Sequence, residues 1–586
     1  MKSLRYIFII PLAGLSFSCS DFLDQVPDDR QTIEEVFQKK ATTEQYLANV
    51  YTYVRDDADQ WDHSPWTSNS DEMVTSWTEY PTYQINVGNW DAANSPFSFW
   101  GHYYNGIRAA TYFMNNVEKN QELQRLNPEL IVQYKAEARF LRAYFYFMLM
   151  QQYGPVILVG EEVLPVDASS ADLQLPRSPF DSCVSYVVRE LDLATSALPV
   201  EHSSADFGRA TNGAAMAIKS RVLLYAASPL YNGNTALAAF KNHDGTQLIS
   251  QTYDASKWEA AANAAKAVID LNYYSLYKDP GNDPIQSYRG IHLEPWNSET
   301  IFARKANGLD NYDVHANPRQ AGGWNGLGPT QEMVDAYFMS DGLPISNESF
   351  APASPLYSET GYTDGIFNMY VNREPRFYAS ITYNRSIWNG GSLSGPTPIN
   401  LEKSGPNSPD GHVSDWSRTG YLVRKNVSPY TNAGSGGTDE RYRRPLIYSR
   451  LGEIYLNYVE ALNEYAPGHP DILVYLNMIR ERAGIPEYGK GIPVPDNQDK
   501  MRDAIRRERR IELAFEYHRW FDIRRWKVAE QYTSGPLHGM NIYGDGDDFH
   551  KRAVAIKRVF RPAYYWFPIT QYELDRGKLI VQNPGW

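Results

Sequence analysis

The chain has 586 residues and a formal charge of −13, from 56 Lys and Arg against 69 Asp and Glu. Nucleic-acid binding rests on clustered basic side chains, so this acidic balance argues against a nucleic-acid partner. Aromatic residues make up 14% of the chain, with 14 Trp and 43 Tyr, which is a large supply of flat amphipathic surface for a core or a binding site.

Residues 1–18 have the pattern of a secretory signal peptide. A basic start precedes the apolar stretch Tyr6–Phe17, which is much shorter than the roughly 20 apolar residues that a membrane span needs. Cys19 follows directly, as in bacterial lipoproteins, where cleavage leaves an acylated cysteine. We therefore expect a lipoprotein signal peptide over 1–18, lipidation of Cys19 and a polar tether over 19–31. An ordinary secreted protein with a chance cysteine is the alternative.

Helical periodicity follows the tether, which predicts a mainly helical fold. A capping-box pattern at Thr42–Gln45 should open an early helix. The clearest segment is 136–153, where two adjacent apolar stripes predict a helix packed on more than one side. Gly154–Pro155 should end that helix, and a short buried extended run should follow over 156–159. Further helices are expected over 100–117, 211–227, 258–269, 451–465 and 471–483.

Two regions interrupt this helical pattern. Five tryptophans fall within residues 61–100 among Asp, Asn, Ser and Pro, and residues 291–440 are rich in loop-forming residues. Within the second region, 376–383 and 421–425 alternate as strands do. The sequence thus predicts one unit over 32–586. Its helical scaffold should span about 32–290 and 440–530, and its loop-rich ligand part about 291–440 plus 61–100.

The densest charge block is Ile505–Lys527, in which Arg and Glu alternate along an apparent helix. Opposite charges four residues apart stabilise a helix by only tenths of a kcal/mol per pair. The interleaved acids argue against nucleic-acid binding and favour a structural ion network.

Motifs for catalysis or metal binding are missing from the sequence. The 11 histidines show no paired-ligand spacing, two cysteines cannot form a zinc site, and no nucleophile elbow occurs. The 69 acidic residues leave room for a carboxylate pair suited to glycoside hydrolysis, but nothing singles one out. We therefore expect no catalytic residue, no metal and no cofactor.

The chain resembles the SusD/RagB family, the surface lipoproteins of starch-utilisation-type nutrient uptake. The segments that carry the resemblance run from one end of the chain to the other: Cys19–Asp24, Ser70–Glu72, Trp100–Asn116, Ala136–Pro155, Pro329–Tyr337 followed by Asp341–Gly342, Arg373–Phe377, Glu453–Glu464, Leu476–Gly484, Arg507–Trp526 and Gln582–Trp586.

The resemblance implies tetratricopeptide-like helix pairs that form a scaffold, together with a loop-rich mixed part that holds the ligand. It also implies a lipid anchor in the outer membrane, exposure at the cell surface and a SusC-like TonB-dependent transporter as partner. The family's ligand residues vary with the glycan, so the resemblance implies no particular ligand-binding residues in this chain.

A sugar ring stacks its C–H face on an aromatic ring, and its hydroxyls pair with carboxylates and amides. Trp324 and Asn325 combine both features in a glycine-rich loop, which makes Trp324 the leading stacking platform. Asp71 is the candidate carboxylate. The other candidate aromatic residues are Trp77, Trp90, Trp296 and Trp388.

The leading hypothesis is a non-catalytic surface protein that captures oligosaccharides and delivers them to the transporter. A peptide- or glycopeptide-binding member of the same family is the first alternative, and a secreted glycoside hydrolase is the second. A pure interaction scaffold is the third, although it leaves the loop tryptophans without a role.

Overall fold

The computed structural model describes residues 33–165, 167–169, 171–410, 414–432 and 441–586. The expected signal peptide, Cys19 and the tether therefore lie outside the described residues. Within the described part, no helix combines the length and the apolar character that crossing a bilayer requires.

The fold is mainly helical, as predicted. The helices are α1 (Ile33–Val36), α2 (Lys40–Tyr51), α3 (Pro81–Asn86), α4 (Trp100–Asn116), α5 (Gln121–Leu126), α6 (Pro128–Tyr153), α7 (Phe180–Thr195), α8 (Asn212–Ala227), α9 (Ser256–Ile269), α10 (Pro284–Leu293), α11 (Leu309–Ala316), α12 (Gln331–Val334), α13 (Pro375–Ser380), α14 (Leu451–Tyr465), α15 (Pro470–Arg482), α16 (Gln498–Glu512), α17 (Arg519–Arg525), α18 (Ala529–Thr533) and α19 (Gln571–Arg576).

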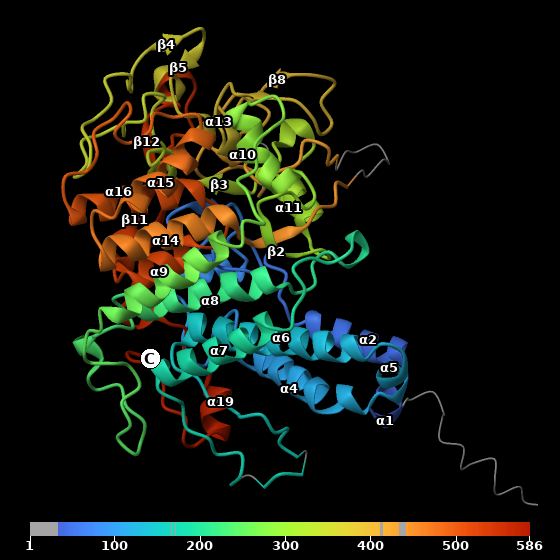
Figure 1. The fold of residues 1–586 in the computed structure, drawn as a ribbon. Coiled ribbons are helices and arrows are strands. Elements are labelled where there is room, and N and C mark those ends of the chain that lie inside the picture. The colour runs from blue at the N-terminus through green and yellow to red at the C-terminus, as the bar shows by residue number, and fades with distance from the viewer. Residues whose placement is uncertain (1–32, 166, 170, 411–413, 433–440) are drawn as a thin grey trace, which may run out of the picture.

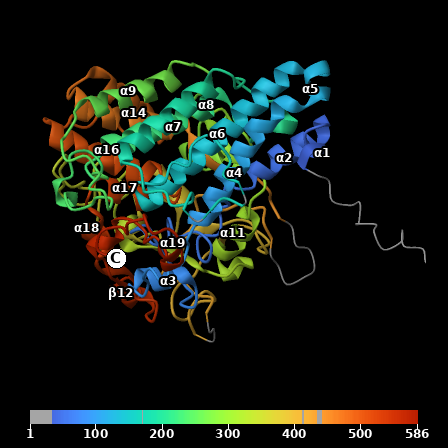
Figure 2. The ribbon, with the colours of Figure 1, turned by 90° about the horizontal axis from the view of Figure 1, so that it is seen from below.

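The longer helices pack side by side in a continuous array. Helix α4 packs on α6, α6 on α7, α7 on α8, and α8 on α9. Helix α9 then packs on α14, which packs on both α15 and α16. The array therefore passes from the first half of the chain to the second without a break, as Figures 1 and 2 show. This stacking of helical neighbours is the arrangement expected of tetratricopeptide-like pairs.

Short strands pair two by two, mostly in the loop-rich part. The pairs, all antiparallel, are β1 (Met73–Thr75) with β3 (Leu327–Pro329), β2 (Thr300–Arg304) with β10 (Leu446–Arg450), β4 (Tyr362–Thr363) with β5 (Ile366–Phe367), β6 (Ile381–Thr382) with β9 (Leu422–Val423), β7 (Ile387–Trp388) with β8 (Thr397–Pro398), and β11 (Gly535–Met540) with β12 (Arg552–Arg558).

Two of these pairs hold distant segments together. The β1–β3 pair joins the tryptophan-rich segment 61–100 to the glycine loop near residue 324. The β2–β10 pair closes the loop-rich part against the start of α14. The loop-rich part lies at one end of the helical array, above α8 and α14 in Figure 1.

Most helix ends agree with the local signals. Helix α6 ends at Tyr153 because Gly154 takes a left-handed φ of 74°. Helix α8 begins after Thr211, whose side chain accepts a hydrogen bond from the Ala214 amide, as expected for an N-cap.

Four local predictions were wrong. Helix α2 starts at Lys40, so Thr42 lies inside it and does not cap it. Residues 156–159 form no strand, and three of the four are only half-buried. Of the strand predicted over 376–383, residues 376–380 belong to α13, because Pro375 occupies a helix N-terminal position that its ring favours. The remainder is confirmed at 381–382, which pair with 422–423 of the other predicted strand. Residues 505–527 form two helices, separated by Phe515 and Tyr517 with φ of 62° and 69°.

The charged block forms the expected structural ion network, and it does so inside the core. Arg450 pairs with Glu299 at 2.6 Å, with Glu512 at 2.8 Å and with Glu516 at 2.7 Å, and all four side chains are at most 5% exposed. Burial opposes the ionisation of Glu512, but its arginine partners outweigh burial and lower its pKa to about 2. This network links the loop-rich part to α14 and α16.

Candidate functional site

Trp324 is presented at the surface by the loop that connects α11 to β3. Its side chain is 43% exposed, whereas most tryptophans of the chain are buried. Its backbone amide donates to the Val314 carbonyl at 2.9 Å, which fixes the loop against α11. The indole is therefore held by its backbone while its ring stays open to solvent.

Two rings contact this indole, and each of them packs on a further ring. Trp324 meets Trp77 edge-on at 6.4 Å and His315 at 4.5 Å between ring centroids. His315 stacks on Trp61 at 3.7 Å with an interplanar angle of 15°, and Trp77 meets Tyr80 edge-on at 5.9 Å. We call these five residues the Trp324 platform. Trp61, Trp77 and His315 are buried and support it, while Trp324 and Tyr80 reach the surface.

Glycine is required where Trp77 crosses the loop. A Cβ at Gly326 would lie 1.9 Å from the Trp77 ring, closer than any real contact. The Trp77 ring is fixed from its other end by a 3.1 Å hydrogen bond from its Nε1 to Oδ1 of Asp415. The glycine-rich sequence around Trp324 thus serves close packing as well as exposure.

Carboxylates border the platform on the Tyr80 side. Burial raises the pKa of Tyr80, and the negative charges of Asp62, Glu79, Asp59 and Asp415 raise it further. Burial lowers the pKa of His315, so its imidazole is neutral at pH 7, with Nδ1 paired to the Asn311 carbonyl at 2.8 Å. The site therefore offers aromatic faces beside hydrogen-bond acceptors for hydroxyl groups.

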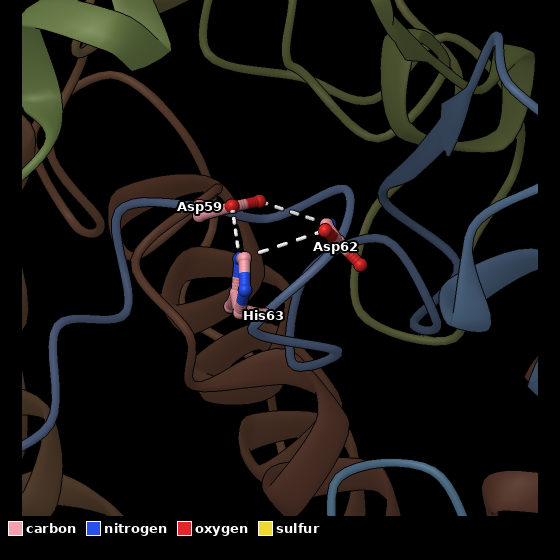
Figure 3. A group of neighbouring side chains, drawn as sticks. All are labelled: Asp59, Asp62 and His63. Carbon is pink, nitrogen blue, oxygen red and sulfur yellow. Dashed lines mark hydrogen bonds and ion pairs between the residues drawn. The ribbon is translucent and has the colours of Figure 1, made fainter.

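Asp59, Asp62 and His63 lie together in the loop after α2 (Figure 3). Among the described residues they form the one group whose ligand atoms are close enough, within 4.8 Å, to hold a metal ion. Nδ1 of His63 is 2.5 Å from Oδ2 of Asp59, while Oδ1 of Asp59 accepts the Asp62 amide at 2.9 Å. These bonds account for the spacing, and we interpret the triad as a hydrogen-bonded turn.

Asn325 does not face a ligand, contrary to our expectation. It is fully buried with a left-handed φ of 55°. Its Oδ1 accepts the Arg319 amide at 2.8 Å, and its Nδ2 contacts the carbonyls of Asn407 and Asp415 at 3.4 Å each. The side chain shapes the loop that carries Trp324.

Asp71 is also placed away from the surface. It is 1% exposed and pairs with Nε of Arg519 at 2.7 Å and with a guanidinium nitrogen of Arg510 at 2.6 Å. Burial opposes its ionisation, but these arginine charges lower its pKa to about 2. Its carboxylate is committed to the core and offers no acceptor to a sugar.

Trp90 and Trp388, two further candidate tryptophans, belong to the core, as does Trp77. Trp90 is 4% exposed and packs on Tyr564, Phe567 and Trp586 at centroid distances of 4.7, 4.9 and 4.6 Å. Trp388, in β7, is 1% exposed, with the Arg424 guanidinium 5.2 Å from its ring. Their burial leaves no face for stacking a ligand.

Trp296 lies apart from the Trp324 platform. It is half-buried, has a φ of 53°, and stacks face to face on Phe207 at 4.8 Å. It lines a cavity of about 190 Å³ together with Tyr273, Glu201 and others. One face of its indole is thus covered, and it remains a separate, secondary candidate.

The larger cavities lie on the helical scaffold. One of about 470 Å³ is lined by α2, residues 205–209 and residues 302–306, and another of about 530 Å³ lies against α14 and α16. Neither includes Trp324. A stacking platform needs an open face more than a deep cavity, so we give the exposed indole greater weight.

The sequence predicted Trp324 correctly as an exposed ring. It predicted Trp77 as a further ligand-binding residue, whereas Trp77 is 5% exposed and supports Trp324 from the core. Several partners of these two rings were missed. Trp61 lies between Asp59 and Asp62 in the tryptophan-rich loop, and this aromatic–acidic pattern was a usable signal. His315 lies on an otherwise ordinary helix, and no local pattern marks it. The same holds for Tyr80, whose place depends on the pairing of β1 with β3.

Fold and site together define a helical-repeat protein with an exposed aromatic platform bordered by carboxylates. Two family models match the chain: the SusD family over residues 296–586, and a family described as starch-binding and associating with the outer membrane over residues 21–224. The chain belongs to the SusD/RagB family.

Relatives extend this match over nearly the whole chain. A SusD-like protein of Bacteroides ovatus is 24% identical over 541 residues, which are 90% of this chain and 83% of that protein. The crystal structure of a SusD-like protein from Bacteroides fragilis has a TM-score of 0.76 at 28% identity, covering 96% of this chain and 99% of that one. A surface glycan-binding protein A from Bacteroides fluxus has a TM-score of 0.59 at 19% identity, covering 94% and 100%, which shows a shared fold.

Proposed function

We propose that this protein captures oligosaccharides at the Trp324 platform and delivers them to a TonB-dependent transporter of the outer membrane. The observation that carries the proposal is the exposed indole of Trp324, braced edge-on by Trp77 and His315 and bordered by carboxylates. Family membership, and the glycan binding named for a relative of the same fold, support a carbohydrate ligand.

The geometry suits a sugar ring. The apolar C–H face of a pyranose would lie on the open face of Trp324, where the ring quadrupole favours it. The carboxylates of Asp62 and Glu79 would accept hydroxyl hydrogens at the edge of the same surface. Braced side chains lose little freedom when a ligand binds, so the platform is preorganised. This arrangement binds a ligand and performs no chemical step.

Anchoring and delivery are proposed on the family resemblance. Acylation of Cys19 would hold the protein at the outer membrane, and stable attachment requires more than one acyl chain. The continuous helical array provides an extended surface for docking on a transporter. Gentle detergent extraction followed by affinity capture should recover a large β-barrel protein with this chain. Recovery of the chain alone in every detergent would contradict the partnership.

A panel of glycans and peptides tests the ligand class. Purified protein is incubated with maltoheptaose, laminarihexaose, cellohexaose and a mixed peptide library, and both retention and cleavage are measured. Retention of a glycan without cleavage supports the proposal. Retention of peptides alone favours the peptide-binding alternative, and release of shorter sugars would indicate a glycoside hydrolase.

Trp324→Ala tests the site itself. Stacking on an aromatic ring contributes roughly 1–3 kcal/mol in the related case of nucleic-acid bases, so glycan affinity should fall about 5- to 150-fold. Trp324→Phe should lose less, because it keeps a ring. Trp296→Ala is the matched control at the secondary candidate and should leave affinity unchanged. Equal losses for Trp296→Ala and Trp324→Ala would contradict the assignment.

A further inference from the structure

Four carboxylates gather on one side of the Trp324 platform, and their charge is poorly compensated. The side chains of Asp59 and Asp62 are 26% and 33% exposed, and Glu79 is exposed. Asp415 accepts hydrogen bonds from Trp77 and Ser414. Among the residues that the structure describes, no lysine or arginine lies within ion-pair distance of any of these four carboxylates. His63 lies within that distance of Asp59 and Asp62.

Three arginines lie nearby, and backbone carbonyls hold their guanidinium groups. Arg319 donates to the carbonyls of Pro406, Ser408 and Asp415. Arg418 donates from Nε to the Ser76 carbonyl at 2.8 Å, and Arg441 donates to the Asp310 carbonyl at 3.2 Å. These hydrogen bonds hold the three guanidinium groups against the loops and leave their positive charges in place. Beside Tyr80 itself, the neighbouring charged groups are the carboxylates of Asp62 and Glu79, with Asp59 and Asp415 further away.

We infer that the Trp324 platform admits uncharged oligosaccharides and discriminates against those that carry carboxylate or sulfate groups. The inference rests on the proposed function and adds the charge class of the ligand. An anionic substituent on a stacked sugar would face Asp62 and Glu79. One like-charge pair about 6 Å apart weakens binding roughly 3- to 100-fold, depending on the local dielectric. Specificity of this kind arises from repulsion of the wrong ligand.

The test uses pairs of ligands that differ only in charge. Maltoheptaose, laminarihexaose and cellohexaose are titrated beside the same sugars oxidised at C6 to uronates, and alginate and heparin oligosaccharides are added as natural anionic glycans. The uncharged member of the binding pair should bind at least about tenfold more tightly at 20 mM salt. The difference should shrink at 500 mM salt, because exposed charges are then screened within a few ångströms.

A double variant locates the source of the discrimination. Asp62→Asn with Glu79→Gln removes two charges from the platform edge and should bring the paired affinities closer, by about fivefold or more. Glu162→Gln with Asp167→Asn removes two exposed charges from the connection between α6 and α7 and should leave the difference unchanged. Thermal melts of both variants check that they fold.

The outcomes separate the two proposals. An anionic glycan that binds as tightly as its uncharged counterpart would overturn the charge selectivity and leave glycan capture intact. An unchanged difference in the platform double variant would likewise overturn it, since Asp62 and Glu79 would then not be its source. Binding of no glycan at all would overturn the proposed function, and the inference with it.

Discussion

Asp71→Asn distinguishes a structural carboxylate from a ligand-binding one. Asp71 follows the tryptophan-rich loop, and its carboxylate accepts two hydrogen bonds from Arg519 at 2.7 and 2.9 Å and one from Arg510 at 2.6 Å. The side chain is 1% exposed. An asparagine has nearly the same shape but leaves both guanidinium groups buried without a counter-charge.

Two estimates give the size of the loss. The lowering of the Asp71 pKa from 3.8 to about 2 corresponds to roughly 2.5 kcal/mol in favour of the charged form. Breaking a buried ion pair by removing one partner costs about 3–5 kcal/mol. With an unfolding entropy of about 2.1 cal/mol/K per residue over ~550 residues, 1 kcal/mol shifts Tm by about 0.9 °C. Asp71→Asn should therefore lower Tm by about 2–4 °C.

The assay pairs thermal melts at pH 7 with calorimetric titration of the glycan at 25 °C. Because its folded pKa is depressed, Asp71 contributes its full stabilisation above pH 4 and loses it only as the pH falls towards 2. Asp71→Asn should lower Tm and leave affinity within about twofold. Trp324→Ala should weaken glycan binding and leave Tm nearly unchanged. Trp388→Ala removes a core side chain and should lower the free energy of unfolding by about 3–5 kcal/mol. A loss of affinity at unchanged Tm in Asp71→Asn would refute this reasoning.

Three further predictions concern pH, packing and targeting. Burial and the charge of Asp71 raise the pKa of Glu72 to about 8. Its stabilising contribution is therefore complete below pH 4.5 and is lost as the pH rises through 8. Glu72→Gln should flatten the fall in Tm between pH 5 and 8, and equal slopes in the two proteins would contradict this. Gly326→Ala should displace Trp77, which should lower stability by about 1–3 kcal/mol and weaken glycan binding. In the same melts and titrations, the control Gly395→Ala should change neither stability nor affinity, because its Cβ meets open space. Cys19→Ala should release the protein from membrane fractions, and retention of the variant at high salt would contradict lipidation.

Local signals predicted the helices well, because a helix end depends on residues within one or two turns. Gly154 supplies a left-handed residue after α6, and Ser228–Pro229 follows the end of α8. The same locality explains the wrong strand at 376–380. The alternating pattern covers 376–383, but Pro375 starts a helix and places the first five of these residues in α13. The end of the pattern does form a strand, because β6 pairs there with β9.

Burial could not be predicted in this way, because it depends on distant partners. Asp71 lies on a polar stretch, and the arginines that bury it are more than 430 positions further along the chain. Trp388 lies in a glycine-rich segment much like that of Trp324, yet it is 1% exposed and Trp324 is 43% exposed. Similar local sequences thus give a core residue in one place and a surface platform in the other.

The pairing of β1 with β3 explains why the platform forms where it does. Its register sets Thr75 opposite Leu327, and the Ser76 amide continues the ladder by donating to the Gly326 carbonyl at 2.9 Å. Trp77, the next residue, must then cross Gly326, and only a residue without a Cβ leaves room for its ring. Crossing there brings Trp77 to the edge of Trp324. The exposed indole is therefore braced by a strand from the other end of the loop-rich part, and its rigidity follows from backbone pairing as much as from the rings themselves.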